Sequence, residues 1–258
     1  MNYSEPDRTR SLSGVEIEVV TTGQRPDLES EAKAAFRAVW PEFIFHDPVS
    51  REYIDRVEAF FPRYDVLMLE RGEVVAGGWG VPLSWDGDVS HLPDGYDGAL
   101  VSAVAGHEQG IEADTLSVMA AAVRRDRHGQ GLAGLVLTEL RQRAAAAGLQ
   151  QVLAPVRPTL KSRCPLTPMA EFARWIGEDG QHLDPWIRTH QRLGATILAP
   201  APRSMVITGS VAEWESWATM SFPQSGHYVV PGALDLVEID CEADRGTYTE
   251  TNLWMRHS

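Results

Sequence analysis

Hydrophobic and polar residues follow regular periods through the first part of the chain. Residues 15–21 alternate valine and isoleucine with polar residues, which predicts a strand with one buried face. Residues 27–40 carry apolar side chains along one helical stripe, and a second helix is expected over residues 50–61. Residues 65–70 and 74–81 are apolar runs separated by a short turn, which predicts a hairpin. The chain is therefore expected to begin as strand, two helices and hairpin.

The strongest pattern lies in the middle of the chain. Residues 116–123 form an apolar run short enough to be a buried strand. After a charged turn, apolar residues recur at helical spacing from Leu132 to Ala147, and Gly148 provides a C-terminal stop. A further strand is predicted over residues 151–156. The central unit is therefore a strand, a turn, a glycine-rich entry, a helix and a second strand.

Between the hairpin and this unit, residues 84–112 are rich in turn-forming residues and show little periodicity. The simpler interpretation is a solvated loop between two strands. The segment is also placed to form a lid over an acyl-binding pocket, with Trp79 and Trp85 as natural pocket walls. The sequence is compatible with both interpretations.

The periodicity of hydrophobic residues is less regular after residue 156. A helical patch is expected over residues 169–176, and Pro185 and Gly194 bracket a helix of about two turns. The remaining predicted elements are strands over residues 196–198, 205–209 and 236–239 and a short helix over 211–219. At the other end of the chain, residues 1–14 are polar without a period and predict a loose tail.

Composition places the chain among acidic globular proteins. Of its 258 residues 43% are hydrophobic, which suffices for one large core. The net charge of −13 and the pI of about 5.0 argue against binding to nucleic acid or to an anionic membrane surface. Cys164 and Cys241 lack the spacing of a zinc site or a disulfide framework. No apolar stretch is long enough to span a bilayer, so a cytoplasmic protein is expected. No bound metal is expected either.

Glycines 129, 131 and 134 mark the start of the central helix. Glycine lets a phosphate approach the backbone closely, and a helix start offers unpaired N–H groups and the positive end of a dipole. The spacing satisfies the dinucleotide fingerprint G-x-G-x-x-G. However, the charged residues 124–128 separate the strand from the first glycine, and no carboxylate ends the next strand. Arg157, near that strand end, would suit a 2′-phosphate, which keeps the dinucleotide hypothesis open.

A second phosphate-binding pattern fits better. A strand ending at Val123, a turn of basic residues that would suit a polyphosphate, and then His128-Gly-Gln-Gly-Leu-Ala resemble the acyl-CoA signature of the GCN5-related N-acetyltransferase (GNAT) superfamily, Arg/Gln-x-x-Gly-x-Gly/Ala. In that family backbone N–H groups of the loop hold the CoA pyrophosphate, and His128 stands where Arg or Gln is usual. The resemblance implies acetyl-CoA or another acyl-CoA as cosubstrate. The cofactor-binding residues it implies are Ala121, Ala122, Val123, His128, Gly129, Gln130, Gly131, Leu132, Ala133, Gly134 and Arg192.

The same resemblance implies the fold. An α/β (α+β) GNAT fold has a mixed, mainly antiparallel sheet, flanking helices and, in this chain, a C-terminal extension. The parallel strands over residues 116–123 and 151–156 would splay around the cofactor. The chain would then divide into a flexible tail (1–14), an acyltransferase domain (15–200) and C-terminal strands packed on that domain (201–258).

The helix that ends before Gly194 carries the second part of the resemblance. His190-Gln-Arg-Leu-Gly-Ala resembles the penultimate helix of the family, Tyr-x-Lys/Arg-Leu-Gly-Phe, whose Tyr protonates the leaving CoA thiolate. His190 occupies the Tyr position. A lone histidine in a helix often has a structural role, but an imidazole also titrates near neutral pH. At this position it predicts a general acid or base.

A narrower resemblance connects residues 186–195, 204–214 and 228–234 to GNAT-like domains of polyketide synthase loading modules. Those domains are associated with decarboxylation of a malonyl-type unit by a His and a Thr. His190 and Thr159 are the matching positions here. A protonated His190 would stabilise the carboxylate or the enolate, and the Thr159 hydroxyl would bind a carbonyl or carboxylate or else simply start a turn.

Three functions therefore remain open. The first is an acyltransferase that uses acetyl-CoA or a related thioester on a small amine or a carrier-bound thiol, with His190 as general acid or base. The second is a malonyl or methylmalonyl thioester decarboxylase, and the third is a non-catalytic acyl-CoA-binding module. The expected partner is a small-molecule acceptor or an acyl carrier protein, and neither nucleic acid nor a membrane is expected.

Overall fold

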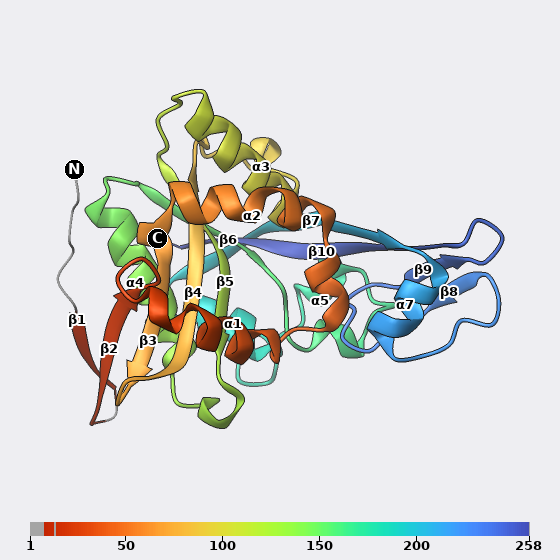
Figure 1. Ribbon diagram of the computed structural model, residues 1–258, viewed down its shortest axis with the longest axis horizontal. Helices are drawn as coiled ribbons and strands as arrows, with labels where there is room; N and C mark the ends of the chain where they lie inside the picture. Colours follow the sequence, from red (N-terminus) through yellow and green to blue (C-terminus); the bar gives the residue numbers. More distant parts are fainter. Residues whose placement is uncertain (1–7, 13, 258) are drawn as a thin grey trace.

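The computed structural model describes residues 8–12 and 14–257, and a ten-stranded sheet forms its centre (Figure 1). The strand order is β1-β2-β3-β4-β5-β6-β10-β9-β8, with β7 paired to β10. The strands are β1 (Arg8–Leu12), β2 (Val15–Thr21), β3 (Asp65–Glu70), β4 (Glu73–Leu83), β5 (Thr115–Val123), β6 (Gln151–Val156), β7 (Ala195–Gly209), β8 (Gly226–Tyr228), β9 (Val237–Asp240) and β10 (Arg245–His257). The helices are α1 (Glu29–Arg37), α2 (Pro48–Phe60), α3 (Gly95–Glu108), α4 (Leu132–Ala146), α5 (Met169–Phe172), α6 (Pro185–Arg192) and α7 (Val211–Ala218). Among the described strands only β5 and β6 pair in parallel, so the predicted mixed, mainly antiparallel sheet is confirmed.

β5 and β6 separate after a short stretch of pairing. Their parallel ladder comprises three residue pairs and ends at Ser117 opposite Leu153. On its other side β5 stays paired with β4 as far as Val123, with a bulge at Met119. A bulge bends a strand and increases its twist. Beyond Ser117, therefore, the edge of β5 that faces β6 is free of sheet pairing.

Helices cover both faces of the sheet. A Cβ atom added at Gly77 in β4 would lie 2.7 Å from Phe36 of α1, and one added at Gly78 would lie 2.5 Å from Val136 of α4. Because successive residues of a strand point to opposite faces, α1 and α4 lie on opposite sides of the sheet. Among the described residues, no helix combines the length and apolar character needed to cross a bilayer.

The segment expected as a solvated loop or lid contains a well-packed helix, α3. Leu100 and Val104 on this helix are fully buried, and its start lies against β7, where the Tyr96 N–H donates to Ser204 Oγ at 2.8 Å. Alanines and glycines alternate with leucine and valine here, so the helix has no clear polar face for a periodic pattern to reveal. The expectation of an irregular segment over residues 84–112 was therefore wrong for most of its length.

The C-terminal strand β10 connects the main sheet to the extension. Residues 253–257 pair with β6, and residues 245–248 pair with β9. At its extension end a second core gathers around the buried Trp214 and Tyr248, where α7, β8 and β9 form one end of the molecule (Figure 1). The boundary expected at residue 200 falls inside β7, and residues 253–257 belong to the central sheet.

Part of the expected N-terminal tail is a strand. β1 pairs with β2 along its whole length, and Arg10 forms an ion pair of 2.8 Å with the buried Glu139 of α4. The prediction of a loose tail was wrong for residues 8–12. Residues 1–7 and 13 of the expected tail lie outside the described residues.

A buried and a partly buried carboxyl group lie close together where α2 and α3 begin. Asp47 caps α2 by accepting the Ser50 N–H at 2.6 Å, and its side chain interacts electrostatically with Asp97 on α3. Burial and the negative charge of Asp47 raise the pKa of Asp97 to about 8. Two carboxylates in contact cannot both be charged without a large energetic cost, so Asp97 holds a proton in the folded protein at neutral pH.

Asp97→Asn should therefore stabilise the protein. The folded pKa of Asp97 lies above its unfolded value of 3.8, so stability is lost as the unfolded state ionises between about pH 4 and pH 8. The amide of the variant cannot ionise and keeps a donor for Asp47, so the variant should gain about 1–3 kcal/mol in free energy of unfolding at pH 7.5, and less at pH 4. Urea unfolding at both pH values measures this difference. Asp94→Asn, an exposed change at the same helix start, is the control and should show no such pH dependence; equal stability of Asp97→Asn and wild type at pH 7.5 would refute the shared proton.

Candidate active site

A cavity of about 740 Å³ lies between the sheet and the helices α1 and α2. Ala120, Ala121 and Ala122 line it from the free edge of β5, and Ala154 to Val156 line it from β6. The cavity therefore reaches the gap between the two splayed strands. Short alanine side chains leave room for an extended ligand to follow the strand edge and bond to its backbone.

The loop between β5 and α4 has the geometry of a phosphate cradle. Gly129 and Gly131 have φ angles of 79° and 83°, a region that glycine adopts without strain. Gly131 is the N-cap of α4, and no side chain caps this helix start. A Cβ atom added at Gly129 would meet no atom within 4 Å. One added at Gly131 would lie 3.7 Å from Leu12 of β1, at ordinary contact distance. The first N–H groups of α4, which no side chain caps, are thus available to a ligand.

The basic residues of this turn are already engaged with the protein. Their partners are Asp126 and Glu73 for Arg124, Glu70 for Arg127, the Ala38 carbonyl for Arg125 and the Val123 carbonyl for His128. The Nε2 of the His128 imidazole lies 2.9 Å from the Val123 carbonyl at the end of β5, so this nitrogen is engaged within the protein. Backbone N–H groups, more than these side chains, are available to a polyphosphate.

α6 and β10 bring two histidines together beside the cavity. Asp184 caps the start of α6 by accepting two backbone N–H groups, which fixes this short helix. His190 on α6 lines the cavity, is 1% exposed, and lies with its Nδ1 2.9 Å from Nε2 of His257. The Nε2 of His190 is buried and has no hydrogen-bond partner in the described part of the chain.

Burial keeps this pair of imidazoles neutral. Desolvation, and to a lesser extent the neighbouring His257, hold the pKa of His190 well below its usual value. Burial and the nearby Arg141 lower the pKa of His257 to about 4. At neutral pH the Nε2 of His190 therefore belongs to an uncharged ring. The expectation that a protonated His190 stabilises a carboxylate or an enolate is not compatible with this environment.

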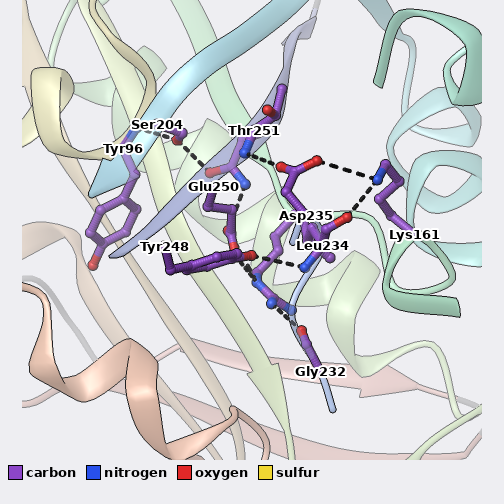
Figure 2. Close-up of polar contacts among 11 residues, drawn as sticks. Tyr96, Lys161, Ser204, Gly232, Leu234, Asp235, Tyr248, Glu250 and Thr251 are labelled. Carbon is purple, nitrogen blue, oxygen red and sulfur yellow. Dashed lines mark hydrogen bonds and ion pairs between the residues drawn. The ribbon is translucent and has the colours of Figure 1, made fainter. Parts of the chain in front are cut away.

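A buried polar network forms the far wall of the cavity (Figure 2). Glu250 is fully buried and accepts hydrogen bonds from Tyr248 at 2.7 Å, from Asn252 at 2.8 Å and from Arg157 at 2.9 Å. Arg157 also donates to the Gly232 carbonyl. The Arg157 that would have suited a dinucleotide 2′-phosphate is thus occupied within the protein. Lys161 binds the loop that contains Gly232 by donating to the Leu234 carbonyl and pairing with Asp235.

Four residues expected at the site have clear positions. Trp79 lines the cavity. Trp85 is 3% exposed, lies in the main core with its indole N–H bonded to the Asp88 carbonyl, and does not line the cavity. Thr159 is exposed and donates to Asp184, and Arg192 donates to Gln181. Neither Thr159 nor Arg192 reaches the cavity lining, so the structure does not bring Thr159 and His190 together in one pocket.

Comparison with known proteins identifies the family. No protein-family model matches the chain. The arginine N-acetyltransferase avaD of Aspergillus versicolor is 30% identical in an alignment of 271 positions that covers 92% of each chain. The chain belongs to the GCN5-related N-acetyltransferase (GNAT) superfamily. It is an acyl-CoA-dependent acyltransferase of the GNAT type.

Solved structures share the GNAT fold over nearly the whole chain. The loading GNATL domain of CurA from Lyngbya majuscula has a TM-score of 0.58 and 15% identity, covering 94% of this chain and 97% of that one. The GphF GNAT-like decarboxylase, solved with isobutyryl-CoA, has a TM-score of 0.51 and 14% identity, covering 98% and 99%. At these identities the likeness concerns the fold alone, including the C-terminal extension.

Two features of this GNAT enzyme, one beside the cavity and one in its lining, were not anticipated from its sequence. His257 lies 67 residues from His190 and next to the chain end, so no local motif connects them. Asp65, at the start of β3, lines the cavity and accepts from Thr22 Oγ1 at 2.7 Å. A carboxylate at the edge of an apolar strand was the available signal for Asp65. For His257 only the strand pairing of β10 could have provided one.

The glycine loop leads to a matched pair of variants. Gly131 and Gly148 sit at opposite ends of α4 with φ angles of 83° and 81°, so valine at either position should cost a similar amount of stability, about 1–3 kcal/mol. Only Gly131→Val places a branched side chain beside the proposed phosphate cradle. Calorimetry should show CoA affinity reduced at least about tenfold in Gly131→Val and unchanged in Gly148→Val. Equal affinities in the two variants would show that CoA does not bind at this loop.

Proposed function

We propose that this enzyme transfers the acetyl group of acetyl-CoA to a small amine, with His190 as the general base. The observation that carries the proposal is His190, which lines the cavity that reaches the free edge of β5 and whose buried Nε2 has no partner among the described residues. The first turn of α4 would bind the CoA pyrophosphate, and Ala120 to Ala122 would bind the pantetheine chain. The arginine N-acetyltransferase relative supports an amine as the acceptor.

The reaction needs one proton acceptor and one proton donor, and His190 can serve as both. The amine nitrogen attacks the thioester carbonyl carbon, its lone pair forms the C–N bond, and the carbonyl electron pair moves to oxygen. The Nε2 of His190 takes the proton from nitrogen. The oxygen electron pair then restores the C=O bond as the C–S bond breaks, and the proton passes from His190 to the thiolate. Because burial lowers the pKa of His190, its protonated form is a strong acid toward a thiolate.

The acceptor side of the cavity contains a carboxylate suited to a cationic acceptor. Among the cationic side chains that line the cavity, Lys33 pairs with Glu29 and Glu58, and Arg157 pairs with Glu250. Asp65 forms no ion pair with another described residue. Burial, together with the negative charges of Glu58 and Glu29, raises the pKa of Asp65. A positively charged group of the acceptor would relieve this unfavourable environment, so we propose Asp65 as an acceptor-binding residue.

Decarboxylation of a malonyl thioester receives less support from this geometry. That reaction was expected to need Thr159 and a protonated His190. The Thr159 hydroxyl donates to Asp184 outside the cavity, and His190 lies in surroundings that disfavour its charge. A carrier-bound acceptor, the other finer possibility, would require a surface that recognises the carrier, and no feature of the described cavity favours it over a small amine.

The assignment of His190 is tested by amine acetylation. His190→Ala should reduce kcat by about 10²-fold or more, because general acid–base catalysis contributes on this scale. Acetyl-CoA binding, measured by calorimetry, should persist and show that the variant is folded. Thr159→Val should retain wild-type activity, and malonyl-CoA alone should yield no acetyl-CoA. Full activity of His190→Ala would refute the catalytic role, and Thr159-dependent turnover of malonyl-CoA would establish the decarboxylase instead.

Asp65→Asn should weaken binding of the acceptor alone. Loss of a partly buried charged interaction should raise KM for a cationic amine by about tenfold or more, while KM for acetyl-CoA stays unchanged. Asp55→Asn, an exposed change on α2 outside the cavity, is the matched control. Steady-state kinetics with arginine as acceptor measure KM for the acceptor and KM for acetyl-CoA separately. An unchanged acceptor KM in Asp65→Asn would exclude this residue from acceptor recognition.

A further inference from the structure

His257 is held rigidly beside the proposed catalytic base. Its strand, β10, pairs with two neighbours at this point, so that His257 lies opposite Val152 of β6 and Ala195 of β7. The side chain is 4% exposed. Its Nε2 lies 2.9 Å from Nδ1 of His190, and Trp186 stands edge-on to the His190 ring on the other side, with 4.4 Å between ring centroids. The His190 ring therefore contacts the central sheet through His257 and its own helix through Trp186.

A hydrogen bond between two neutral imidazoles needs one N–H and one lone pair. Which ring donates decides what the other nitrogen of His190 can do. If His257 donates, the Nε2 of His190 carries a hydrogen and cannot accept a proton. If His190 donates through Nδ1, its Nε2 carries the lone pair that a general base requires.

The proposed role of His190 requires the second arrangement. Its Nε2 must hold a lone pair, so its Nδ1 carries the ring hydrogen, and Nε2 of His257 is the acceptor 2.9 Å away. His257 then carries its own hydrogen on Nδ1, which has no hydrogen-bond partner among the described residues.

We propose that His257 is a positioning residue that holds His190 in the tautomer whose Nε2 accepts the proton of the attacking amine. The proposal rests on the proposed acetyl transfer for its catalytic consequence and on the histidine pair for its geometry. The hydrogen bond to His257 fixes the orientation of the His190 ring as well as its tautomer, because the ring cannot rotate without breaking this bond. His257 itself does not line the cavity and contacts no reacting atom.

The charged group that faces the pair comes from α4. The Arg141 guanidinium donates to the Leu193 carbonyl at 2.9 Å and disfavours a positive charge on His257, while His257 disfavours one on His190. Both rings therefore remain neutral through the physiological range. The proposal predicts that kcat is nearly independent of His190 titration between about pH 6 and pH 8, where an exposed imidazole would titrate.

Two variants of His257 separate positioning from packing. His257→Phe keeps the ring volume but removes the acceptor, whereas His257→Gln can place its Oε1 near the original Nε2. His257→Phe should lower kcat by about 10-fold or more with KM for acetyl-CoA unchanged. His257→Gln should recover most of the lost kcat. If the two variants are equally impaired or equally active, His257 acts through packing alone and the proposal fails.

The tautomer can be measured without any reaction. Nitrogen NMR of the protein labelled with ¹⁵N-histidine, with signals assigned by their loss in His190→Ala, should show a protonated Nδ1 and an unprotonated Nε2 for His190. In His257→Phe the same signals should show a mixture of tautomers. A protonated Nε2 in the wild type would overturn the proposal. If the wild type acetylates no amine, the proposed function falls, and the NMR result still decides whether His257 sets the tautomer.

Discussion

The short parallel ladder between β5 and β6 is the constraint on which the site depends. Pairing stops at Ser117, and the bulge at Met119 bends β5. Backbone groups beyond this point must find other partners, because buried N–H and C=O groups are costly when unpaired. The same crossover that connects the two strands carries α4, whose uncapped N-terminus lies just after the end of β5. One topological feature thus supplies a free strand edge and an anion-binding helix start side by side.

Charge is distributed so that few groups remain available to a ligand. Glu250 is held by Arg157, and the arginines at 124 and 127 by acidic neighbours. The buried charge of Glu250 is stable only when it is paired and hydrogen-bonded. Against this background, two residues of the cavity lining stand out. The Nε2 of His190 has no hydrogen-bond partner among the described residues, and the Asp65 carboxylate accepts from Thr22 but forms no ion pair with a described residue. Both are therefore the natural places for substrate chemistry.

The sequence allowed the central unit to be predicted because its signals are local. Glycines 129 and 131 do have positive φ angles, and the strand and helix beside them lie close to their expected bounds. β10 was missed because its inward-facing positions include Glu250 and Asn252, whose polarity hides the alternation. α3 was missed because it has no polar face, and Trp85 was misplaced with it. The His190–His257 contact depends on strand pairing across the whole fold, which no spacing along the chain encodes.

The central claim is that one acyl-CoA reaches from the start of α4 along the free edge of β5 to the cavity that His190 lines. A crystal structure with a non-hydrolysable thioether analogue of acetyl-CoA tests this most directly. The pyrophosphate should contact the N–H groups of residues 129–133, and the pantetheine should lie along Ala120 to Ala122. The Nε2 of His190 should face the acyl carbon with room for the attacking amine between them, within reach of the amine proton at about 3 Å or through one water molecule. An analogue bound away from this gap, or an acyl group on the far side of the sheet from His190, would contradict the account.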